Sequence, residues 1–253
     1  MTGFWEGPEL EWSAQSSRGR VRPDNEDSWV VEPLPKPRTW LAVVADGIGG
    51  NQGGQIASSM AVKLSVEHLK AHFGQAEPQR LLKEAIRDGN ASILRAGLDK
   101  DGFPGMGTTF TGAIISEDGR RVDVGHVGDS RAYLVSGSTI TQITDDHSVS
   151  GELVQDGTLS EEDAMKHPGR NMLTRAMGTQ DEVMVSTYQE ELSLGDVVLL
   201  CTDGLTGLVC SKEIVSLLNE KPREEAAEAL VDLANSRGGF DNTTVVLLWP
   251  DLD

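Results

Sequence analysis

The stretch that decides the fold reads Leu41-Ala42-Val43-Val44-Ala45-Asp46-Gly47-Ile48-Gly49-Gly50. An apolar run of this length, rich in valine and alanine and closed by Asp-Gly, predicts a buried β-strand that delivers Asp46 to its end. Glycine beside the carboxylate leaves the backbone bare, so that an ion or a ligand can approach closely. A plain turn is the alternative, because Asp-Gly is also a common turn dipeptide. Recurrence of the pattern elsewhere in the chain would favour a site.

The same pattern recurs at three other places. An apolar run over residues 197–201 leads to Thr202-Asp203-Gly204, the run 122–127 leads to Asp129, and Asp241 directly precedes the terminal apolar run. Several aspartates around one point repel one another unless cations bind between them. Oxygen ligands without a matching Cys or His set favour Mg²⁺ or Mn²⁺ over Zn²⁺. Four independent turns remain the alternative interpretation.

An arginine lies close to further acids near the N-terminus. Arg22 is followed by Glu26 and Asp27, and a guanidinium group near bound cations is suited to holding a phosphate. A pair of metal ions with an activated water would hydrolyse a phosphoester. The alternative for Arg22 is a surface ion pair with Asp24 or Glu26.

The remaining pattern predicts one domain over residues 1–253 with an α+β fold. Helices are expected at 55–73, 79–96, 212–218 and 223–235, and residues before 10 read as a loose leader. Short strands separated by tight turns imply antiparallel pairing, so we expect two antiparallel sheets with helices outside. Residues 145–179 are polar and interrupted by Gly and Pro, which indicates a functional insertion with one helix start at 160–163. Strands are expected at 10–15, 29–31, 40–45, 108–116, 122–127, 131–135, 138–143, 184–189, 196–201 and 243–249.

Composition excludes some classes of partner. The formal charge of −18 argues against nucleic acid or an anionic membrane surface, because both would be repelled. No stretch approaches the roughly 20 apolar residues that span a bilayer. The first residues lack the pattern of a signal peptide, and two cysteines are too few for a disulfide framework. We therefore expect a cytoplasmic protein.

Six motifs in a fixed order carry a resemblance to a known family. They are Arg-x-x-Asn-Glu-Asp at 22–27, Ala-Asp-Gly-Ile-Gly-Gly at 45–50, Met-Gly-Thr-Thr at 106–109, Val-Gly-Asp-Ser-Arg at 127–131, Thr-Asp-Gly-Leu at 202–205 and Asp-Asn-Thr-Thr at 241–244. Together they resemble the metal-dependent serine/threonine protein phosphatases of type 2C, in their compact bacterial form. The resemblance runs from about Trp12 to Trp249.

The resemblance implies an α-β-β-α sandwich with the site at one end of two stacked sheets. It implies a flap at 145–179, hydrolysis of phosphoserine and phosphothreonine in proteins by a metal-bridging hydroxide, and signalling opposite a cognate serine/threonine kinase. A monomer is expected. The chain departs from the family pattern at one position, because many bacterial relatives carry a flap histidine where this chain has Asn171.

The resemblance also assigns roles to single residues. Two Mg²⁺ or Mn²⁺ ions are expected in the core site, with a third, weaker ion beside them. Asp27, with Glu26 as a second candidate, would act through bound water, and Arg22 would bind the substrate phosphate. The metal ligands by position are Asp46 as the bridge, the Gly47 carbonyl on one ion, Asp203 and Asp241 on the other, and Asp129 with Asp203 on the third.

Overall fold

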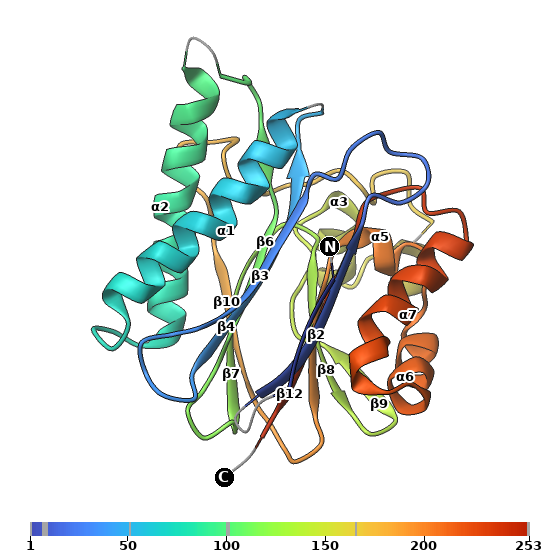
Figure 1. The fold of residues 1–253 in the computed structure, drawn as a ribbon. Coiled ribbons are helices and arrows are strands. Elements are labelled where there is room, and N and C mark those ends of the chain that lie inside the picture. The colour runs from blue at the N-terminus through green and yellow to red at the C-terminus, as the bar shows by residue number, and fades with distance from the viewer. Residues whose placement is uncertain (1, 7–9, 51, 100–101, 165, 252–253) are drawn as a thin grey trace.

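Two antiparallel β-sheets form the centre of the molecule, and helices cover both outer faces (Figure 1). The structure is a computed structural model that describes residues 2–6, 10–50, 52–99, 102–164 and 166–251. We call the sheet that contains the first and last strands sheet I. Its strand order is β1 (Thr2–Glu6), β2 (Leu10–Ser17), β12 (Thr243–Pro250), β11 (Val197–Cys201), β8 (Arg131–Ser136) and β9 (Thr139–Gln142).

The other sheet, sheet II, carries the stretch quoted first. Its short strand β5 (Gly107–Thr108) pairs with the end of β4, and Thr108 forms an isolated bridge with Met177. Every strand pair in both sheets is antiparallel, as the tight turns predict. The main strand order is β10 (Ser186–Glu191), β7 (Arg121–Val127), β6 (Phe110–Ile115), β4 (Trp40–Ile48) and β3 (Asp27–Pro33).

Strand β4 is apolar throughout because both of its faces are buried. Leu41, Val43 and Ala45 pack against the helices of sheet II, whereas Ala42 and Val44 pack between the two sheets. Side chains of a strand alternate between faces, so a strand covered on both sides shows no polar alternation. The same division separates alternate residues of β11 and β12.

Two pairs of helices complete an α-β-β-α sandwich, as predicted (Figure 1). Helices α1 (Gln52–His72) and α2 (Pro78–Leu98) cover sheet II. Helices α6 (Ser211–Glu220) and α7 (Arg223–Ser236) cover sheet I. On α7 the buried residues Ala226, Leu230 and Ala234 recur every four positions, the spacing of one helix face.

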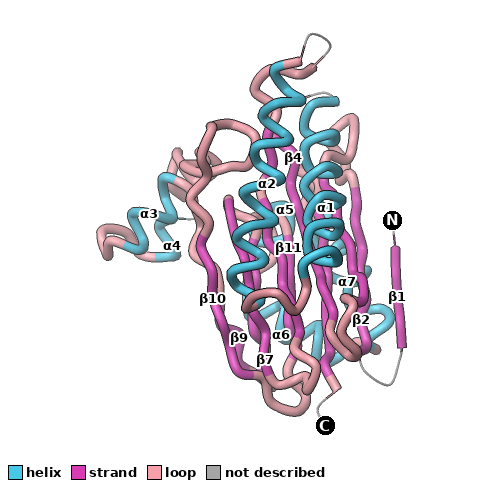
Figure 2. Tube along the Cα trace, turned by 90° about the vertical axis from the view of Figure 1, so that its left-hand side faces the viewer, coloured by secondary structure: helices cyan, strands magenta, loops and turns pink. Residues whose placement is uncertain are grey.

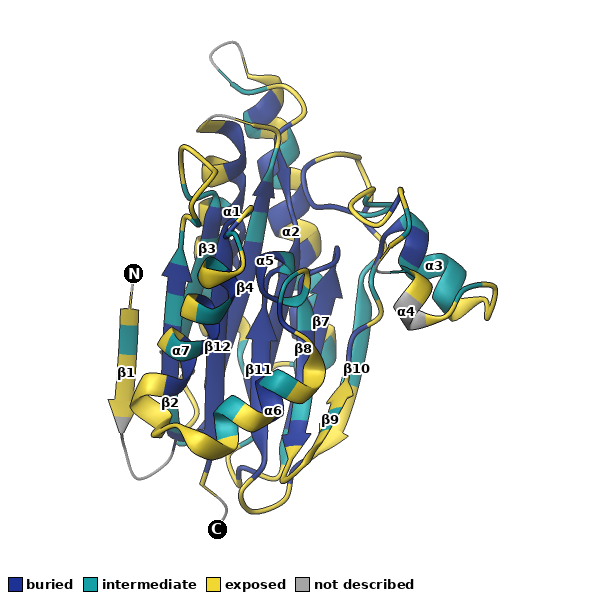
Figure 3. Ribbon diagram, turned by 90° about the vertical axis from the view of Figure 1, so that its right-hand side faces the viewer, coloured by how far each residue is buried: buried dark blue, intermediate teal, exposed yellow. Residues whose placement is uncertain are grey.

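The flap, residues 145–179, leaves the sandwich beside β10 (Figure 2). It contains α3 (Val149–Gln155) and α4 (Glu161–Ala164), which are far less buried than the strands (Figure 3). The helix start expected at 160–163 is confirmed by α4. Helix α3 was not predicted, although Ser148 caps it by accepting a hydrogen bond from the Gly151 amide at 3.1 Å.

Three expectations need correction. Residues 2–6 are not a loose leader, because β1 pairs with β2 along its whole length; residues 1 and 7–9 of that leader lie outside the described residues. Strand β4 continues to Ile48, so Asp46 lies inside the strand rather than after it. A short helix, α5 (Asp203–Thr206), directly follows β11 and was not predicted. Among the described residues, no helix is long and apolar enough to cross a membrane.

Candidate metal centre

Two aspartates, the buried Asp27 and the half-buried Asp46, pair across strands β3 and β4. Asp27 pairs with Asp46 in the strand register, and alternation along β4 places Asp46 on the face of Ala42 and Val44, toward sheet I. The Oδ2 atom of Asp27 accepts hydrogen bonds from Thr202 Oγ1 at 2.9 Å and from Thr244 Oγ1 at 2.7 Å. Asp27 therefore joins both sheets at the end of the sandwich where Asp46 lies.

The backbone of Asp46 is fixed by two threonines. Its amide donates to Thr109 Oγ1 at 2.8 Å, and its carbonyl accepts from the Thr109 amide and from Thr108 Oγ1, each at 2.9 Å. The Thr109 hydroxyl also lies 2.7 Å from Ser130 Oγ. This bond links the end of β4 to the loop that carries Asp129.

Each Asp-Gly pair brings two backbones together. A Cβ added to Gly47 would lie 2.2 Å from the Gly54 carbonyl oxygen, and one added to Gly204 would lie 1.9 Å from the Asn242 carbonyl oxygen. Any side chain there would collide with backbone, so only glycine fits. Gly47 lies in a strand and Gly204 in a helix, so the plain-turn interpretation is wrong for both.

The side-chain amide group of Asn242 holds the loop that carries Arg22. The side chain of Asn242 accepts from the Glu26 amide at 2.8 Å and donates to the carbonyls of Arg18 and Asp24, each at 2.9 Å. Arg22 lies in the loop held this way, on the same side as Asp241. The fold thereby places the guanidinium group beside the carboxylates.

Arg22 pairs with a different acid from the ones expected of a surface ion pair. Its Nη2 atom donates to Asp241 Oδ2 at 2.6 Å, and its side chain is 52 % exposed. The alternative partners Asp24 and Glu26 are neighbours in sequence, whereas Asp241 comes from the far end of the chain. The predicted phosphate-binding arginine and one predicted metal ligand are thus in direct contact.

The predicted site residues converge on one cleft of about 210 Å³. Asp27 is not among its lining residues and lies buried beside Asp46 on the neighbouring strand. Asn171 lines the cleft in addition, which brings the flap to its edge. The predicted residues in the lining are Arg22, Glu26, Asp46, Gly47, Asp129, Asp203 and Asp241.

Burial, followed by the charges of neighbouring aspartates, raises the pKa values of several carboxylates at the site. Burial, with the charges of the other aspartates next, raises the pKa of Asp46 well above its ordinary value. Burial raises the pKa of Asp27 to about 7 and that of Asp203 to about 6, and burial followed by the charge of Asp203 raises that of Asp129. Such crowding disfavours the ionised forms, and bound cations would offset it.

The donor atoms fit Mg²⁺ or Mn²⁺. The Oδ1 atoms of Asp27 and Asp203 are buried and have no hydrogen-bond partner in the described part of the chain, and the set consists of oxygen ligands. As the side chains stand, no three of the described His, Cys, Asp or Glu residues form a ready-made metal cage. Asp241 is paired with Arg22 instead, so this pair must rearrange for Asp241 to bind an ion.

Four residues that support the site were not predicted as site residues. Thr109, Thr202, Thr244 and Asn242 position the carboxylates or the Arg22 loop. Each belongs to a quoted motif, and all except Thr109 stand next to or near an aspartate in the sequence. Their roles depend on contacts between strands that are distant in sequence, which spacing alone does not reveal.

Comparison with known proteins shows which family the chain resembles. A family model described as protein phosphatase 2C matches residues 17–238. The serine/threonine phosphatase stp of Listeria monocytogenes is 38 % identical over 242 residues, which cover 94 % of this chain and 95 % of that protein.

Solved structures are similar over nearly the whole chain. The Mycobacterium tuberculosis serine/threonine phosphatase PstP has a TM-score of 0.86 at 34 % identity, over 96 % of this chain and 99 % of that one. The catalytic domain of PstP in complex with two manganese ions has a TM-score of 0.83 at 33 % identity, over 97 % and 99 %. Since the family model covers most of the sequence and these structures match its fold, the chain belongs to the protein phosphatase 2C family.

Proposed function

We propose that this chain removes phosphate from phosphoserine and phosphothreonine in proteins with Mg²⁺ or Mn²⁺ ions held at the end of the sandwich. Family membership makes it a metal-dependent serine/threonine protein phosphatase. The observation that carries the residue-level proposal is the convergence of Asp46, Asp203 and Asp241 with Arg22 on one cleft. The Oδ1 atom of Asp203, buried and without a hydrogen-bond partner among the described residues, supports it.

The carboxylates divide into direct and indirect ligands. Asp46 would bind both core ions, with the Gly47 carbonyl on one and Asp203 and Asp241 on the other. Asp27 does not line the cleft, and two threonines already donate to its Oδ2 atom. Its proposed role is therefore to hold water through the remaining oxygen, as we also propose for Glu26.

We extend the proposal to a third ion between Asp129 and Asp203. Both carboxylates line the cleft, and burial followed by the charge of Asp203 raises the pKa of Asp129, as expected for a buried acid beside another acid. When bound, the cations of the site would neutralise phosphate charge and lower the pKa of a water molecule.

Arg22 would bind the phosphate of the substrate. Its guanidinium group offers several donors in one plane, and only Nη2 contacts Asp241. The side chain is half exposed at the edge of the cleft, where a phosphate can reach it. Arg22 would then orient the phosphate and stabilise charge that builds up during hydrolysis.

The cellular setting belongs to the proposal as well. We infer a monomeric phosphatase in the bacterial cytoplasm that opposes a serine/threonine kinase in signalling. The bacterial serine/threonine phosphatases among its relatives support this setting. The charge of −18 agrees with protein substrates rather than nucleic acid.

The decisive experiment measures hydrolysis of a phosphothreonine peptide with Mn²⁺, with and without a chelator. Wild type should be active, and both chelation and Asp203→Asn should abolish most of the activity. Asp232→Asn, on the exposed face of α7, is the matched control and should leave the rate unchanged. Activity that survives chelation, or that Asp203→Asn leaves intact, would contradict the proposed mechanism.

A further inference from the structure

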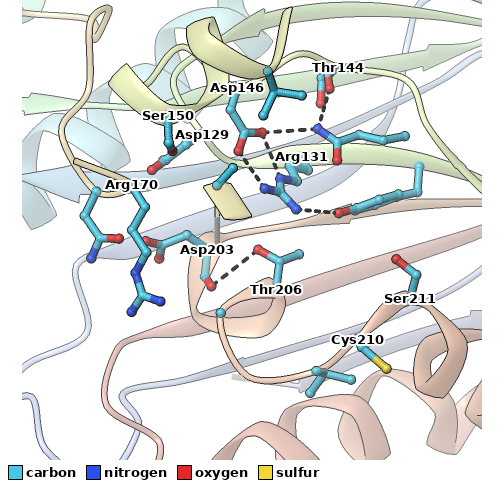
Figure 4. Close-up of a pocket in the computed structure, with 18 of the residues that line it drawn as sticks. Asp129, Arg131, Thr144, Asp146, Ser150, Arg170, Asp203, Thr206, Cys210 and Ser211 are labelled. Atoms are coloured by element: carbon cyan, nitrogen blue, oxygen red, sulfur yellow. Dashed lines mark hydrogen bonds and ion pairs between the residues drawn. The ribbon is translucent and has the colours of Figure 1, made fainter. Parts of the chain in front are cut away.

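A second cavity, of about 430 Å³, adjoins the catalytic cleft. It lies between the flap and the segment that follows β11, and Figure 4 shows Asp129 and Asp203 on its side nearest the proposed metal site. Cleft and cavity share four lining residues, Asp129, Asn171, Asp203 and Asp241. We call this space the flap cavity. A substrate bound in the cleft therefore has the flap cavity directly beside it.

The polar wall of the flap cavity is already internally paired. Arg131 donates to both carboxylate oxygens of Asp146, at 2.8 and 2.6 Å, and to the Tyr133 hydroxyl at 3.0 Å (Figure 4). Gln142 donates to the Thr144 carbonyl and to Asp146. Breaking these bonds to bind a polar group would leave buried partners unsatisfied. This wall offers little to a charged or polar ligand.

The acids of the lining are also committed elsewhere. Asp145 accepts a hydrogen bond from the Tyr188 hydroxyl, and Asp146 is paired with Arg131. In the proposed function Asp129, Asp203 and Asp241 bind cations. The flap cavity is therefore not an acidic pocket that selects a basic side chain.

Six lining residues are apolar, and all but Phe240 come from the two sides of the space. Polar residues also line it: Ser150, Gln155, Arg170, Asn171, Thr206 and Ser211. The flap helices contribute one part, and the segment from α5 into α6 contributes the other. A side chain placed between them would bury apolar surface on two sides. The apolar lining residues are Val154, Ala164, Leu208, Val209, Ile214 and Phe240.

We propose that the flap cavity binds a bulky apolar side chain of the substrate, such as leucine or phenylalanine, close to the phosphorylated residue. An extended peptide advances about 3.4 Å per residue, so a residue one or two positions away can reach a space that shares a wall with the cleft. This inference rests on the proposed function. It adds that sequence preference is set by the flap cavity, independently of phosphate binding.

The test compares phosphothreonine peptides that carry leucine or serine at each of the positions within two residues of the phosphothreonine. Wild type in Mn²⁺ should favour one leucine position by about tenfold or more in kcat/KM, the discrimination expected of an apolar pocket. Val154→Asp places a charge in the apolar wall on α3 and should reduce this preference to within about twofold. Hydrolysis of para-nitrophenyl phosphate, which has no flanking residues, should stay unchanged.

Cys210 allows the flap cavity to be filled without mutation. It lines the cavity and is exposed, whereas Cys201 is fully buried. N-ethylmaleimide should therefore label Cys210 and remove the leucine preference while hydrolysis of para-nitrophenyl phosphate continues. The control variant is Cys210→Ser, in which serine can still cap α6. Treatment with N-ethylmaleimide should leave the leucine preference of this variant intact.

The outcomes separate the inference from the proposed function. If both kinds of substrate are hydrolysed but wild type shows no leucine preference, the inference is overturned and the phosphatase activity stands. A preference that survives both Val154→Asp and labelling overturns it equally. Loss of para-nitrophenyl phosphate hydrolysis on labelling would show that the cavity serves catalysis rather than selection. If neither substrate is hydrolysed in Mn²⁺, the proposed function fails and the inference falls with it.

Discussion

The carboxylate cleft and the flap meet at Asn171 but are built in opposite ways. The carboxylates lie in strands or within a few residues of strand ends, and Thr202 and Thr244 at the end of sheet I donate to Asp27 of sheet II. The flap helices α3 and α4 pack against each other beside the sandwich (Figure 2). Chemistry that needs fixed atoms is placed on the sheets, whereas contact with variable substrates is left to a lightly held segment.

The flap is attached to the sandwich mainly at its base. Three consecutive residues hold it there: the Asp145 carbonyl lies 3.1 Å from His126 Nε2, Asp146 binds Arg131, and His147 Nδ1 accepts from the Gly128 amide at 3.1 Å. All of their partners lie on or next to β7 and β8. The flap can therefore differ in position beyond this base without moving the aspartates.

The largest effect is expected for changes to the carboxylates at the end of the sheets. Asp46→Ala removes the proposed ligand of both core ions and should lower kcat/KM for a phosphothreonine peptide by roughly 1,000-fold. Asp129→Ala removes a ligand of the third, weaker ion only and should cost much less, on the order of tenfold. Steady-state kinetics in saturating Mn²⁺ measures both. The reverse order would show that Asp46 is not the shared ligand.

A smaller effect is expected for the threonines that hold Asp27 in place. Thr244→Val removes one of the two hydroxyls that donate to Asp27, so the carboxylate loses orientation while the apolar shape is nearly kept. The Mn²⁺ concentration for half-maximal activity should rise by roughly 10- to 100-fold. Thr141→Val, on the exposed edge strand β9, is the control. Equal behaviour of the two variants would contradict a role for the inter-sheet threonines.

The smallest effect is the pH dependence of local stability, which should have opposite signs at the base of the flap and at the carboxylates. Burial lowers the pKa of His126 to about 4 and that of His147 to about 3. Below the ordinary histidine pKa of 6.5 the unfolded state binds protons, whereas the folded base of the flap does not. The stability of the flap base therefore falls as pH drops from about 6.5 toward 4. Arg175, Arg131 and Asp146 are the charged groups around the pair.

The carboxylates should respond the other way. The pKa of Asp203 is raised to about 6, so the folded state holds the proton more tightly, and stability falls as pH rises through that value without cations. Hydrogen-exchange protection in chelator, measured between pH 5 and 7.5, should rise with pH by a few-fold in residues 147–172 and fall near β4. Parallel changes in both regions would contradict this contrast.

Parts of both regions could be predicted from sequence. The run ending in Asp46 is apolar because both strand faces are buried, and that fact is visible locally. Strand β1 could not be recognised in the same way, because its partner β2 supplies the hydrogen bonds and Phe4 and Trp5 stay partly exposed. Helix α3 was missed because it has little apolar periodicity.

The site was predicted by residue type but not by contact. Aspartates next to apolar runs, two of them followed by glycine, indicated the carboxylates, yet the partner of Arg22 lies 219 positions away. Local sequence favoured Asp24 or Glu26 as that partner. Asp241 reaches the arginine because β12 pairs with β2 and because Asn242 holds the Arg22 loop. Such contacts follow from the whole fold.

The antiparallel pairing of β3 with β4 tolerates changes of length in the loop that connects them but not inside either strand. The register runs from Asp27 opposite Asp46 to Pro33 opposite Trp40, so the connecting loop at 34–39 lies at the far end from the carboxylates. An insertion of one residue inside either strand would shift the pairing and turn one acid to the wrong face. The loop can change length without that penalty, which makes it a natural place to graft a tag or a binding sequence onto a working phosphatase.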